Sequence, residues 1–461
     1  MMYARATPSE YLSKLTSIIS AVRIGGMLSK LPLFPVAAEV NSKKHLVLGG
    51  CDTVDLANEY GTPLYVFDEH SLRNKCIEVK ENFNQRYDDV VILYACKAFI
   101  CKALVNLLRE QGLGLDVVSG GELGIVKSAG FPIKKVYFHG NNKSAEEISL
   151  ALNWGIGRVV VDNFHELAML NEIAGVKGCK SDILLRLIPG IDPHTHKFIT
   201  TGNIDSKFGF PSVDWEEAVV QAMSEPNINL IGLHFHIGSL IFDIKPYQKA
   251  IEVVLDFAAE MKTKHDFILN ELNVGGGFAI QYVLDSPAPP ISYYAKLITS
   301  EIASRCRRLK LMLPQLVIEP GRSIVGRAGV ALYRVGVVKD IPRVRRYVSV
   351  DGGMADNIRP ALYEAEYEAV VANEMIDKGA YRVTIAGKYC ESGDILVRDI
   401  ELPLISTGDL IAIPGCGAYC VPMASNYNAA FKPAIVMVSG GEARLIRRRE
   451  TVEDLTGCDL D

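Results

Sequence analysis

The stretch from about residue 64 to Arg322 constrains the fold most, because short β-branched runs alternate there with longer segments of helical periodicity. Runs such as VVILYACK predict buried strands, whereas SAEEISLALNWG and YQKAIEVVLDFAAEMKTK carry apolar residues at helical intervals. Eight strands with helical connections over roughly 240 residues predict a closed parallel (β/α)8 barrel. The predicted strands are 90–97, 114–119, 135–140, 158–163, 183–189, 230–239, 269–278 and 315–322.

After Arg322 the pattern changes to short strand-like runs separated by turns, such as YRVGVV, YRVTIAG and PAIVMVS. This pattern predicts a mostly antiparallel β domain of the β-sandwich or Greek-key type, to which residues 36–68 add strands. We therefore divide the chain into four parts. They are a helical or loosely attached extension (1–35), strands of the β domain (36–68), the barrel (69–322) and the remaining β domain (323–461).

Composition excludes several functional classes. The formal net charge of −5 is spread along the chain, so nothing indicates a nucleic-acid partner. No apolar run approaches the roughly 20 residues that span a bilayer, so we expect no membrane partner. Ten cysteines occur without paired CxxC spacing, and several lie in apolar runs. We therefore expect a reducing compartment, the cytoplasm, and no disulfide framework.

Polar residues occur where the predicted barrel strands end, which is where such barrels carry their reactive groups. Lys97 ends the first strand and Asp116 lies in the second. Burial disfavours the ammonium form and lowers the pKa of a lysine, as a Schiff-base lysine requires. The alternative is a structural lysine whose amine reaches solvent.

Three consecutive glycines, Gly275 to Gly277, end the seventh strand and leave backbone N–H groups accessible to an anion. Ser239 and Arg322 are expected at the same mouth, which favours a phosphate site over a simple tight turn. Glu319 must be protonated or paired, and the ring nitrogen of a phosphorylated pyridine would pair with it.

Two HxH pairs, His194/His196 and His234/His236, raise the question of a metal. We expect none, because no third ligand follows at suitable spacing. His236 could lie flat against a cofactor ring, and His234 is interpreted as a packing or hydrogen-bonded histidine.

Ten motifs in order give the sequence a specific resemblance to the fold-type III pyridoxal-phosphate decarboxylases, in particular to those that act on diaminopimelate. Phe99 departs from the pattern, because many relatives have asparagine there; we interpret it as a tolerated variation. The motifs are YACKAF, DVVSGGEL, HGNNKS, SKFGF, HFHIGS, GGGF, EPGR, DGGMADNIRPALY, CESGD and ASNYN.

The resemblance implies a cofactor, pyridoxal 5'-phosphate, and a role for each matching residue. Lys97 would bind the cofactor covalently, His236 would stack on its ring, and Glu319 would bind its pyridine nitrogen. The phosphate would be held by Ser239, Gly276, Gly277 and Tyr427, and Arg322 would be shared between the phosphate and the substrate. Asp116 would also bind the cofactor. Substrate carboxylates would meet Arg322, Arg359, Tyr363 and Tyr427. Cys390 and Glu391 would come from the second subunit of a homodimer with shared active sites.

The implied reaction is decarboxylation of meso-diaminopimelate to L-lysine, with Cys390 as the proton donor. Arg359 suits the second carboxylate of that substrate and Glu391 its second ammonium group. Three alternatives stay open: a decarboxylase acting on ornithine, arginine, carboxynorspermidine or a siderophore precursor, a racemase of related fold, and a cofactor-free regulatory homologue.

Overall fold

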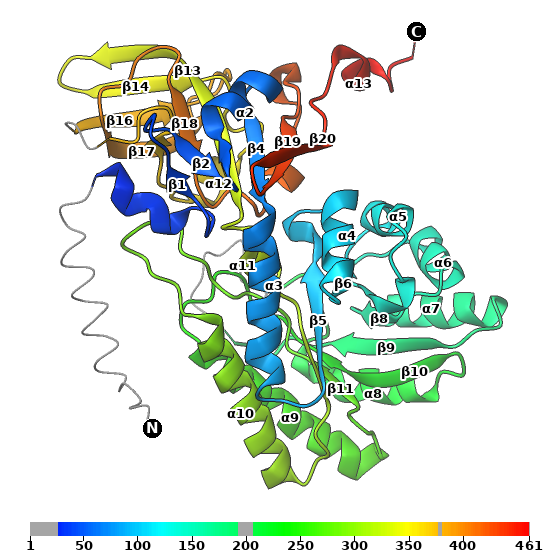
Figure 1. Cartoon of the computed structure of the whole chain (residues 1–461). Coiled ribbons are helices and arrows are strands. Elements are labelled where there is room, and N and C mark those ends of the chain that lie inside the picture. The colour runs from blue at the N-terminus through cyan, green and yellow to red at the C-terminus, as the bar shows by residue number, and fades with distance from the viewer. Residues whose placement is uncertain (1–25, 192–205, 377–379, 461) are drawn as a thin grey trace, which may run out of the picture.

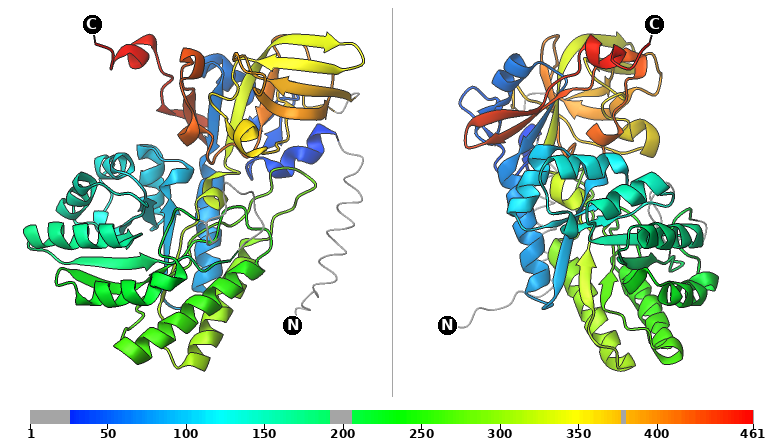
Figure 2. Two further views of the ribbon diagram at one scale, coloured as in Figure 1. Left: turned by 180° about the vertical axis from the view of Figure 1, so that it is seen from behind. Right: turned by 90° about the vertical axis from the view of Figure 1, so that its right-hand side faces the viewer.

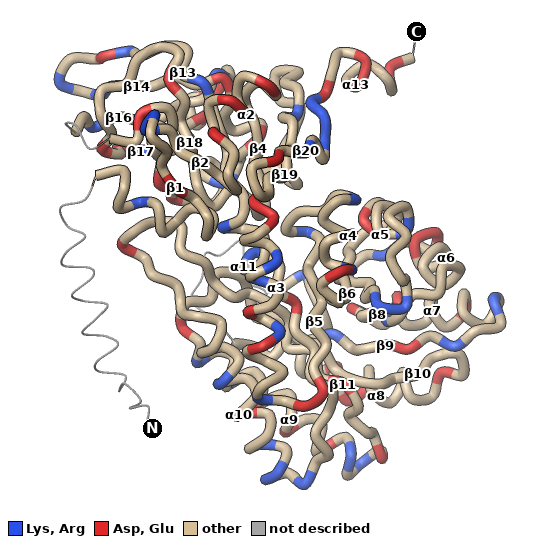
Figure 3. Tube along the Cα trace, in the orientation of Figure 1, with Lys and Arg blue, Asp and Glu red and all other residues tan. Residues whose placement is uncertain are grey.

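The computed structural model describes residues 26–191, 206–376 and 380–460 of the chain. It has a β/α barrel and a β domain, which lie one above the other in two orthogonal views (Figures 1 and 2). Acidic and basic residues are interspersed over both parts (Figure 3). Among the helices of the described ranges, none has the length and apolar character required to span a bilayer.

The barrel is closed and all its strand pairs are parallel, which confirms the predicted fold class. The strands are β5 (Val90–Ala95), β6 (Gly114–Val117), β7 (Val136–Phe138), β8 (Arg158–Val161), β9 (Ser181–Arg186), β10 (Ile228–His234), β11 (Glu271–Asn273) and β12 (Gln315–Ile318). Most of them end a few residues earlier than the sequence pattern indicates, because the chain turns into loops that carry the polar motifs.

Helices surround the barrel, and polar residues that precede them fix where several begin. The side chains of Ser119, Ser144 and Asn163 each accept a hydrogen bond from a backbone N–H of the first helical turn. Helix α3 packs against α10 and so completes the helical ring (Figure 1). The helices are α3 (Glu69–Asn84), α4 (Lys102–Glu110), α5 (Gly120–Ser128), α6 (Ala145–Asn153), α7 (Phe164–Val176), α8 (Trp215–Ser224), α9 (Lys245–His265), α10 (Ile291–Leu309) and α11 (Arg322–Val325).

Apolar side chains fill the interior of the barrel below the site. Leu93, Tyr137, Val160, Leu184 and Val317 form a buried cluster from five different strands. The barrel is therefore a packed core and not a pore, and its polar chemistry is confined to the ends of the strands.

The second part is a nine-stranded sheet built from both ends of the chain, as predicted. Strand β4 pairs antiparallel with β13 and parallel with β19, so the segment before the barrel completes this sheet. A second parallel pair joins β14 and β16, and the other pairs of the described strands are antiparallel. The strands are β4 (Leu64–Asp68), β13 (Gly329–Ile341), β14 (Arg345–Val350), β15 (Val370–Val371), β16 (Tyr381–Ala386), β17 (Ile395–Leu402), β18 (Leu410–Ile413), β19 (Ala434–Ser439) and β20 (Glu442–Arg447).

Smaller elements complete the fold. A separate three-stranded sheet is formed by β1 (Glu39–Val40), β2 (Leu46–Leu48) and β3 (Cys51–Asp52). The remaining helices are α2 (Thr53–Tyr60), α12 (Arg359–Tyr363) and α13 (Val452–Thr456). The 3-10 helices are η1 (Met27–Leu33), η2 (Cys96–Ala98), η3 (Ile133–Lys135), η4 (Ser212–Asp214), η5 (Val421–Met423) and η6 (Tyr427–Ala429).

Most of the expected extension, residues 1–25, lies outside the described residues. The part that is described is not loosely attached, because Met27, Leu33 and Phe34 are buried. The Met27 sulfur also accepts a hydrogen bond from the Val371 backbone at 3.2 Å. The exact division at residues 35, 68 and 322 stays a prediction.

Candidate active site

A cavity of about 480 Å3 lies where the barrel strands end, and residues from the loops of the β domain form part of its wall. Tyr363 and Tyr419 contribute to the wall from that side. Six residues predicted for the site line this cavity: Lys97, His236, Ser239, Glu319, Arg322 and Tyr363. The structure therefore brings together residues that are separated by as much as 266 positions in the sequence.

Lys97 lies in η2, the short turn that directly follows β5. Burial acts to lower the pKa of its amine, as the sequence predicts. The direction of the net shift is nevertheless wrong in the sequence prediction, because Asp116, Tyr419 and Glu319 outweigh burial and raise the pKa above its ordinary value. The acidic groups around the amine therefore favour its protonated form.

Glu319 follows β12 and meets three polar side chains. Asn273 Nδ2 donates to Glu319 Oε1 at 2.7 Å, and His139 Nε2 lies 2.8 Å from the same oxygen. His234 Nε2 lies 3.4 Å from Oε2, so His234 is hydrogen-bonded as predicted. Burial acts to raise the pKa of the Glu319 carboxyl, but the two histidines hold it well below its ordinary value. Glu319 is thus a buried carboxylate, and it can accept a hydrogen bond from the N–H of a protonated ring nitrogen.

His236 is buried beside the glycine turn. Burial, together with Lys97 and Arg186, holds its pKa well below the ordinary value, so the ring is neutral. Its Nδ1 accepts a hydrogen bond from the Gly276 N–H at 3.2 Å. A Cβ on Gly275, whose φ is +70°, would approach that Nδ1 to 2.6 Å. The glycine is therefore required for the imidazole to pack flat against the turn.

Arg322 is one of the cationic residues that line the cavity. Its Nη1 donates to the Tyr282 hydroxyl at 2.6 Å and its Nη2 to Ser239 Oγ at 3.2 Å. The guanidinium also stacks on the Tyr419 ring, 4.5 Å from the centroid. Among the described residues, no carboxylate forms an ion pair with Arg322, so its charge is available to an anionic ligand beside Ser239.

The other predicted residues lie outside the wall of this cavity. Asp116 is buried behind it, with Oδ1 3.8 Å from His139 Nε2. Gly277 lies against Gly238, since a Cβ there would approach Gly238 O to 2.3 Å. Arg359 is buried against the Tyr282 ring, 4.7 Å from the centroid, and Nη1 donates to the Tyr367 hydroxyl.

The segment with Cys390 and Glu391 is an exposed loop between β16 and β17. Tyr427 packs there as well, and its hydroxyl donates to the Cys390 carbonyl at 3.2 Å. None of these three residues lines the cavity that carries Lys97. The homodimer with shared sites stays a prediction.

Sequence reasoning missed several residues of the site. Arg186 and Tyr419 line the cavity, and Tyr282 lies between the two arginines. Arg186 ends β9, so its place at a strand end was a usable signal. Tyr282 lies in the irregular connection between β11 and α10, and Tyr419 in an irregular segment of the β domain; no local pattern points to either residue.

One group of side chains has the composition of a metal site. Ligand atoms of His139, His234 and Glu319 lie within 4.8 Å of one another. The sequence near His234 offers no third ligand, but the fold brings His139 and Glu319 to it from the ends of two other strands. His194 and His196 lie outside the described residues. The expectation of no metal stays a prediction.

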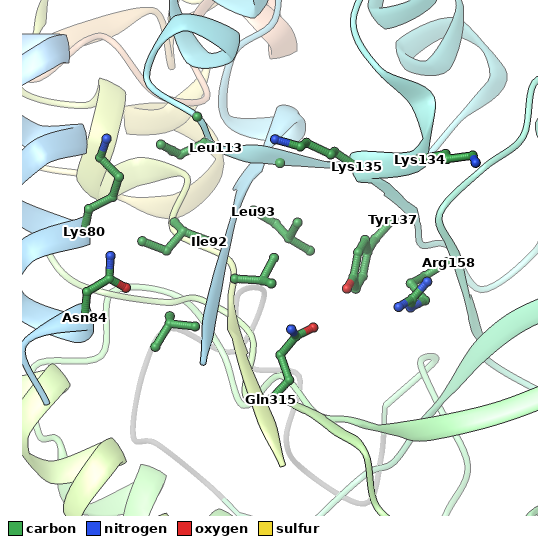
Figure 4. Close-up of a pocket in the computed structure, with 14 residues that line it drawn as sticks. Lys80, Asn84, Ile92, Leu93, Leu113, Lys134, Lys135, Tyr137, Arg158 and Gln315 are labelled. Carbon is green, nitrogen blue, oxygen red and sulfur yellow. The ribbon is translucent and has the colours of Figure 1, made fainter. Parts of the chain in front are cut away.

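A second cavity, of about 360 Å3, lies at the opposite mouth of the barrel (Figure 4). It contains none of the predicted site residues. Two of its cations are already engaged, because Lys80 Nζ donates to Gln111 O at 2.7 Å and Arg158 pairs with Glu271 and Asp182. This mouth of such barrels usually contributes to stability.

Comparison with known proteins identifies close relatives over nearly the whole chain. The family model for the pyridoxal-dependent decarboxylase, pyridoxal binding domain, matches residues 70–326. Diaminopimelate decarboxylase of Bacillus subtilis is 46% identical over 422 residues, which cover 91% of this chain and 96% of that protein. The Mycobacterium tuberculosis enzyme is 40% identical over 424 residues, covering 90% and 94%.

Solved structures agree with these relatives. Diaminopimelate decarboxylase from M. jannaschii in complex with L-lysine superposes with a TM-score of 0.86 and 36% identity, covering 92% of this chain and 98% of that chain. Lysine/ornithine decarboxylase from Vibrio vulnificus has a TM-score of 0.72 at 22% identity, covering 84% and 98%, and this likeness supports the fold alone.

Proposed function

This chain belongs to the diaminopimelate decarboxylases of the pyridoxal-dependent decarboxylase family, and from this premise we propose how its own residues perform the reaction. The enzyme is a pyridoxal-phosphate-dependent carboxy-lyase that converts meso-2,6-diaminopimelate to L-lysine and CO2, the last step of lysine biosynthesis. The observation that carries the proposal is one cavity with an amine, a buried carboxylate and an arginine that pairs with no described carboxylate.

The described residues fit pyridoxal phosphate. Arg322 and Ser239 beside the glycine turn would hold the phosphate, and Glu319 would accept the N–H of the ring nitrogen. Lys97 would hold the cofactor covalently, while neutral His236 would lie against its ring. When bound, the cofactor supplies a conjugated cationic ring that accepts the charge left at Cα as CO2 departs.

Protein groups would then control the proton that replaces CO2. We assign this proton to the thiol of Cys390 of the partner subunit, because Cys390 is exposed on its own chain and does not line that chain's cavity. Ionised Glu319 would keep the ring nitrogen protonated by favouring its cationic form. Lys97, whose amine is buried near the acidic groups Asp116 and Glu319, would be the residue that holds the cofactor in the cavity.

Substrate choice would rest on Arg359, Tyr363 and the partner subunit's Glu391. Arg359 is 2% exposed, and its Nε has no hydrogen-bond partner among the described residues. No described carboxylate pairs with it either, so its charge is left for a ligand carboxylate. Losing such a pairing costs roughly 2–5 kcal/mol, which amounts to about 30-fold to several thousand-fold discrimination against ornithine or lysine.

Assembly and location complete the proposal. A homodimer would bring the partner's Cys390 to the cavity of the other subunit and so complete two shared sites. A cytoplasmic location is supported by ten cysteines that all lie in the described residues and form no disulfide.

The test is a substrate panel with purified enzyme and pyridoxal phosphate. Release of CO2 and product identity are measured for meso-diaminopimelate, ornithine and arginine, with wild type and Arg359→Ala. We expect wild type to prefer meso-diaminopimelate and the variant to lose this preference by about 30-fold or more. An unchanged ratio of kcat/KM values in Arg359→Ala would remove Arg359 from the substrate pocket.

A further inference from the structure

We propose that Tyr282 is a positioning residue that holds Arg322 and Arg359 at a fixed spacing and so helps to set the preference for a substrate with two carboxylates. The inference rests on the proposed function, which assigns Arg322 to the cofactor phosphate and Arg359 to a substrate carboxylate. Tyr282 lies in the irregular connection between β11 and α10, and it does not itself line the cavity. It would therefore act through the two arginines, without touching cofactor or substrate.

Different parts of the Tyr282 side chain contact the two arginines. Arg322 Nη1 donates to the Tyr282 hydroxyl at 2.6 Å. The guanidinium of Arg359 lies over the ring instead, with Cζ 4.7 Å from the centroid. A cation is attracted to the face of an aromatic ring, and this attraction is stronger away from water. One phenol side chain thus stands between two like charges and contacts both of them.

The position of Arg359 depends on two tyrosines. Arg359 is 2% exposed, and its Nε has no hydrogen-bond partner among the described residues. Its Nη1 donates to the Tyr367 hydroxyl, and its Cζ lies 5.3 Å from the centroid of that ring. The rings of Tyr282 and Tyr367 meet edge to face, with centroids 5.4 Å apart and planes at 85°. Removing the Tyr282 ring would therefore leave this buried cation open on one side.

The Tyr282 ring is itself held in place. A Cβ on Gly415 would approach Tyr282 Cδ1 to 3.1 Å and Cε1 to 3.3 Å, so the backbone at Gly415 packs closely against the ring. The side-chain amide of Gln281 donates to Val283 O at 3.1 Å and to Leu284 O at 3.0 Å, which closes the chain around Tyr282. A residue whose own surroundings fix it can hold the groups that it contacts in a defined geometry.

The experiment separates the two contacts with two variants at Tyr282. Tyr282→Phe removes the hydroxyl that accepts from Arg322 and keeps the ring under Arg359, whereas Tyr282→Leu removes both contacts. The Kd for pyridoxal phosphate is measured by equilibrium titration of cofactor-free protein. With saturating cofactor, kcat and KM are then measured for meso-diaminopimelate and for ornithine, and the two kcat/KM values give a preference ratio.

Two matched controls remove similar contacts elsewhere in the chain. Tyr87→Phe removes a hydroxyl that donates to Pro314 O, also at 2.6 Å, where β5 and β12 begin at the opposite end of the barrel. Tyr381→Leu removes a ring that lies 5.2 Å from Cζ of Arg346 in the β domain. Both controls should show the wild-type Kd and the wild-type preference ratio.

We expect Tyr282→Phe to weaken the Kd for pyridoxal phosphate about 3- to 10-fold, because Arg322 loses an acceptor that orients it. The preference ratio of this variant should stay near the wild-type value, because the ring remains under Arg359. In Tyr282→Leu the Kd should weaken to a similar extent. Its preference ratio should in addition fall about 5- to 30-fold, mainly through a higher KM for meso-diaminopimelate, because Arg359 loses the ring.

Three results would overturn the inference: an unchanged Kd in Tyr282→Phe, an unchanged preference ratio in Tyr282→Leu, or a ratio that falls as far in Tyr282→Phe as in Tyr282→Leu. If Tyr282→Leu does not fold, the Kd and the ratio of Tyr282→Phe still test the inference. Failure of the proposed function looks different, because wild type would then release no CO2 or Arg359→Ala would keep the wild-type ratio.

Discussion

Replacing Arg322 by alanine removes the cation that we assign to the cofactor phosphate. In the structure this guanidinium donates to Tyr282 and Ser239 and forms no ion pair with a described carboxylate. A hydrogen bond to a charged group contributes about 1.5–3 kcal/mol, which corresponds to roughly a 10- to 150-fold weaker Kd for pyridoxal phosphate. Arg322→Lys should fall between wild type and Arg322→Ala, because lysine keeps the charge but not the two-pronged geometry.

The assay is equilibrium titration of cofactor-free protein with pyridoxal phosphate, followed by absorbance. Arg346→Ala serves as the matched control, because it removes a half-buried arginine of the β domain whose Nη2 lies 2.8 Å from Asp340. Its Kd should equal that of wild type. A Kd for Arg322→Ala within about threefold of wild type would refute the phosphate assignment, since even one charged hydrogen bond contributes more.

Two further predictions concern the buried carboxyl group of Asp356 and the sharing of active sites between two subunits. Burial raises the pKa of Asp356 to about 6, so the folded state binds its proton more tightly and this contribution to stability is lost as pH rises from about 4 to about 6. We measure the free energy of unfolding of Asp356→Asn and of wild type by urea titration across that range. As the pH rises from about 4 to about 6, the value for the variant minus the value for wild type should increase by about 3 kcal/mol. A difference that does not change with pH would contradict the raised pKa of Asp356. Mixing inactive Lys97→Ala and Cys390→Ala subunits should restore about a quarter of wild-type activity through random reassortment into mixed dimers, and no restoration would exclude shared sites.

The barrel could be predicted from the sequence because its strands are short, apolar and regularly spaced. The same holds for the reactive mouth, since polar residues such as Lys97, His236 and Glu319 follow those strands directly. In the β domain the pattern is weaker. Strands β17 and β20 were missed, because both carry several charged side chains, VRDIEL and EARLIR, that interrupt the alternation.

Electrostatics could not be predicted in the same way. The sequence indicates burial of Lys97, and burial alone lowers the pKa of an amine; the acidic groups that reverse the shift come from other strands. The partners of Glu319 likewise come from three strand ends, at His139, His234 and Asn273. Such contacts depend on barrel closure, so local sequence patterns contain no sign of them.

The most direct test of the account is reductive trapping of bound cofactor with borohydride, followed by digestion and mass spectrometry. We expect one modified peptide, with the reduced cofactor on Lys97, and no modification in Lys97→Ala. Cofactor trapped on another lysine of the wild-type protein, or none at all, would contradict it.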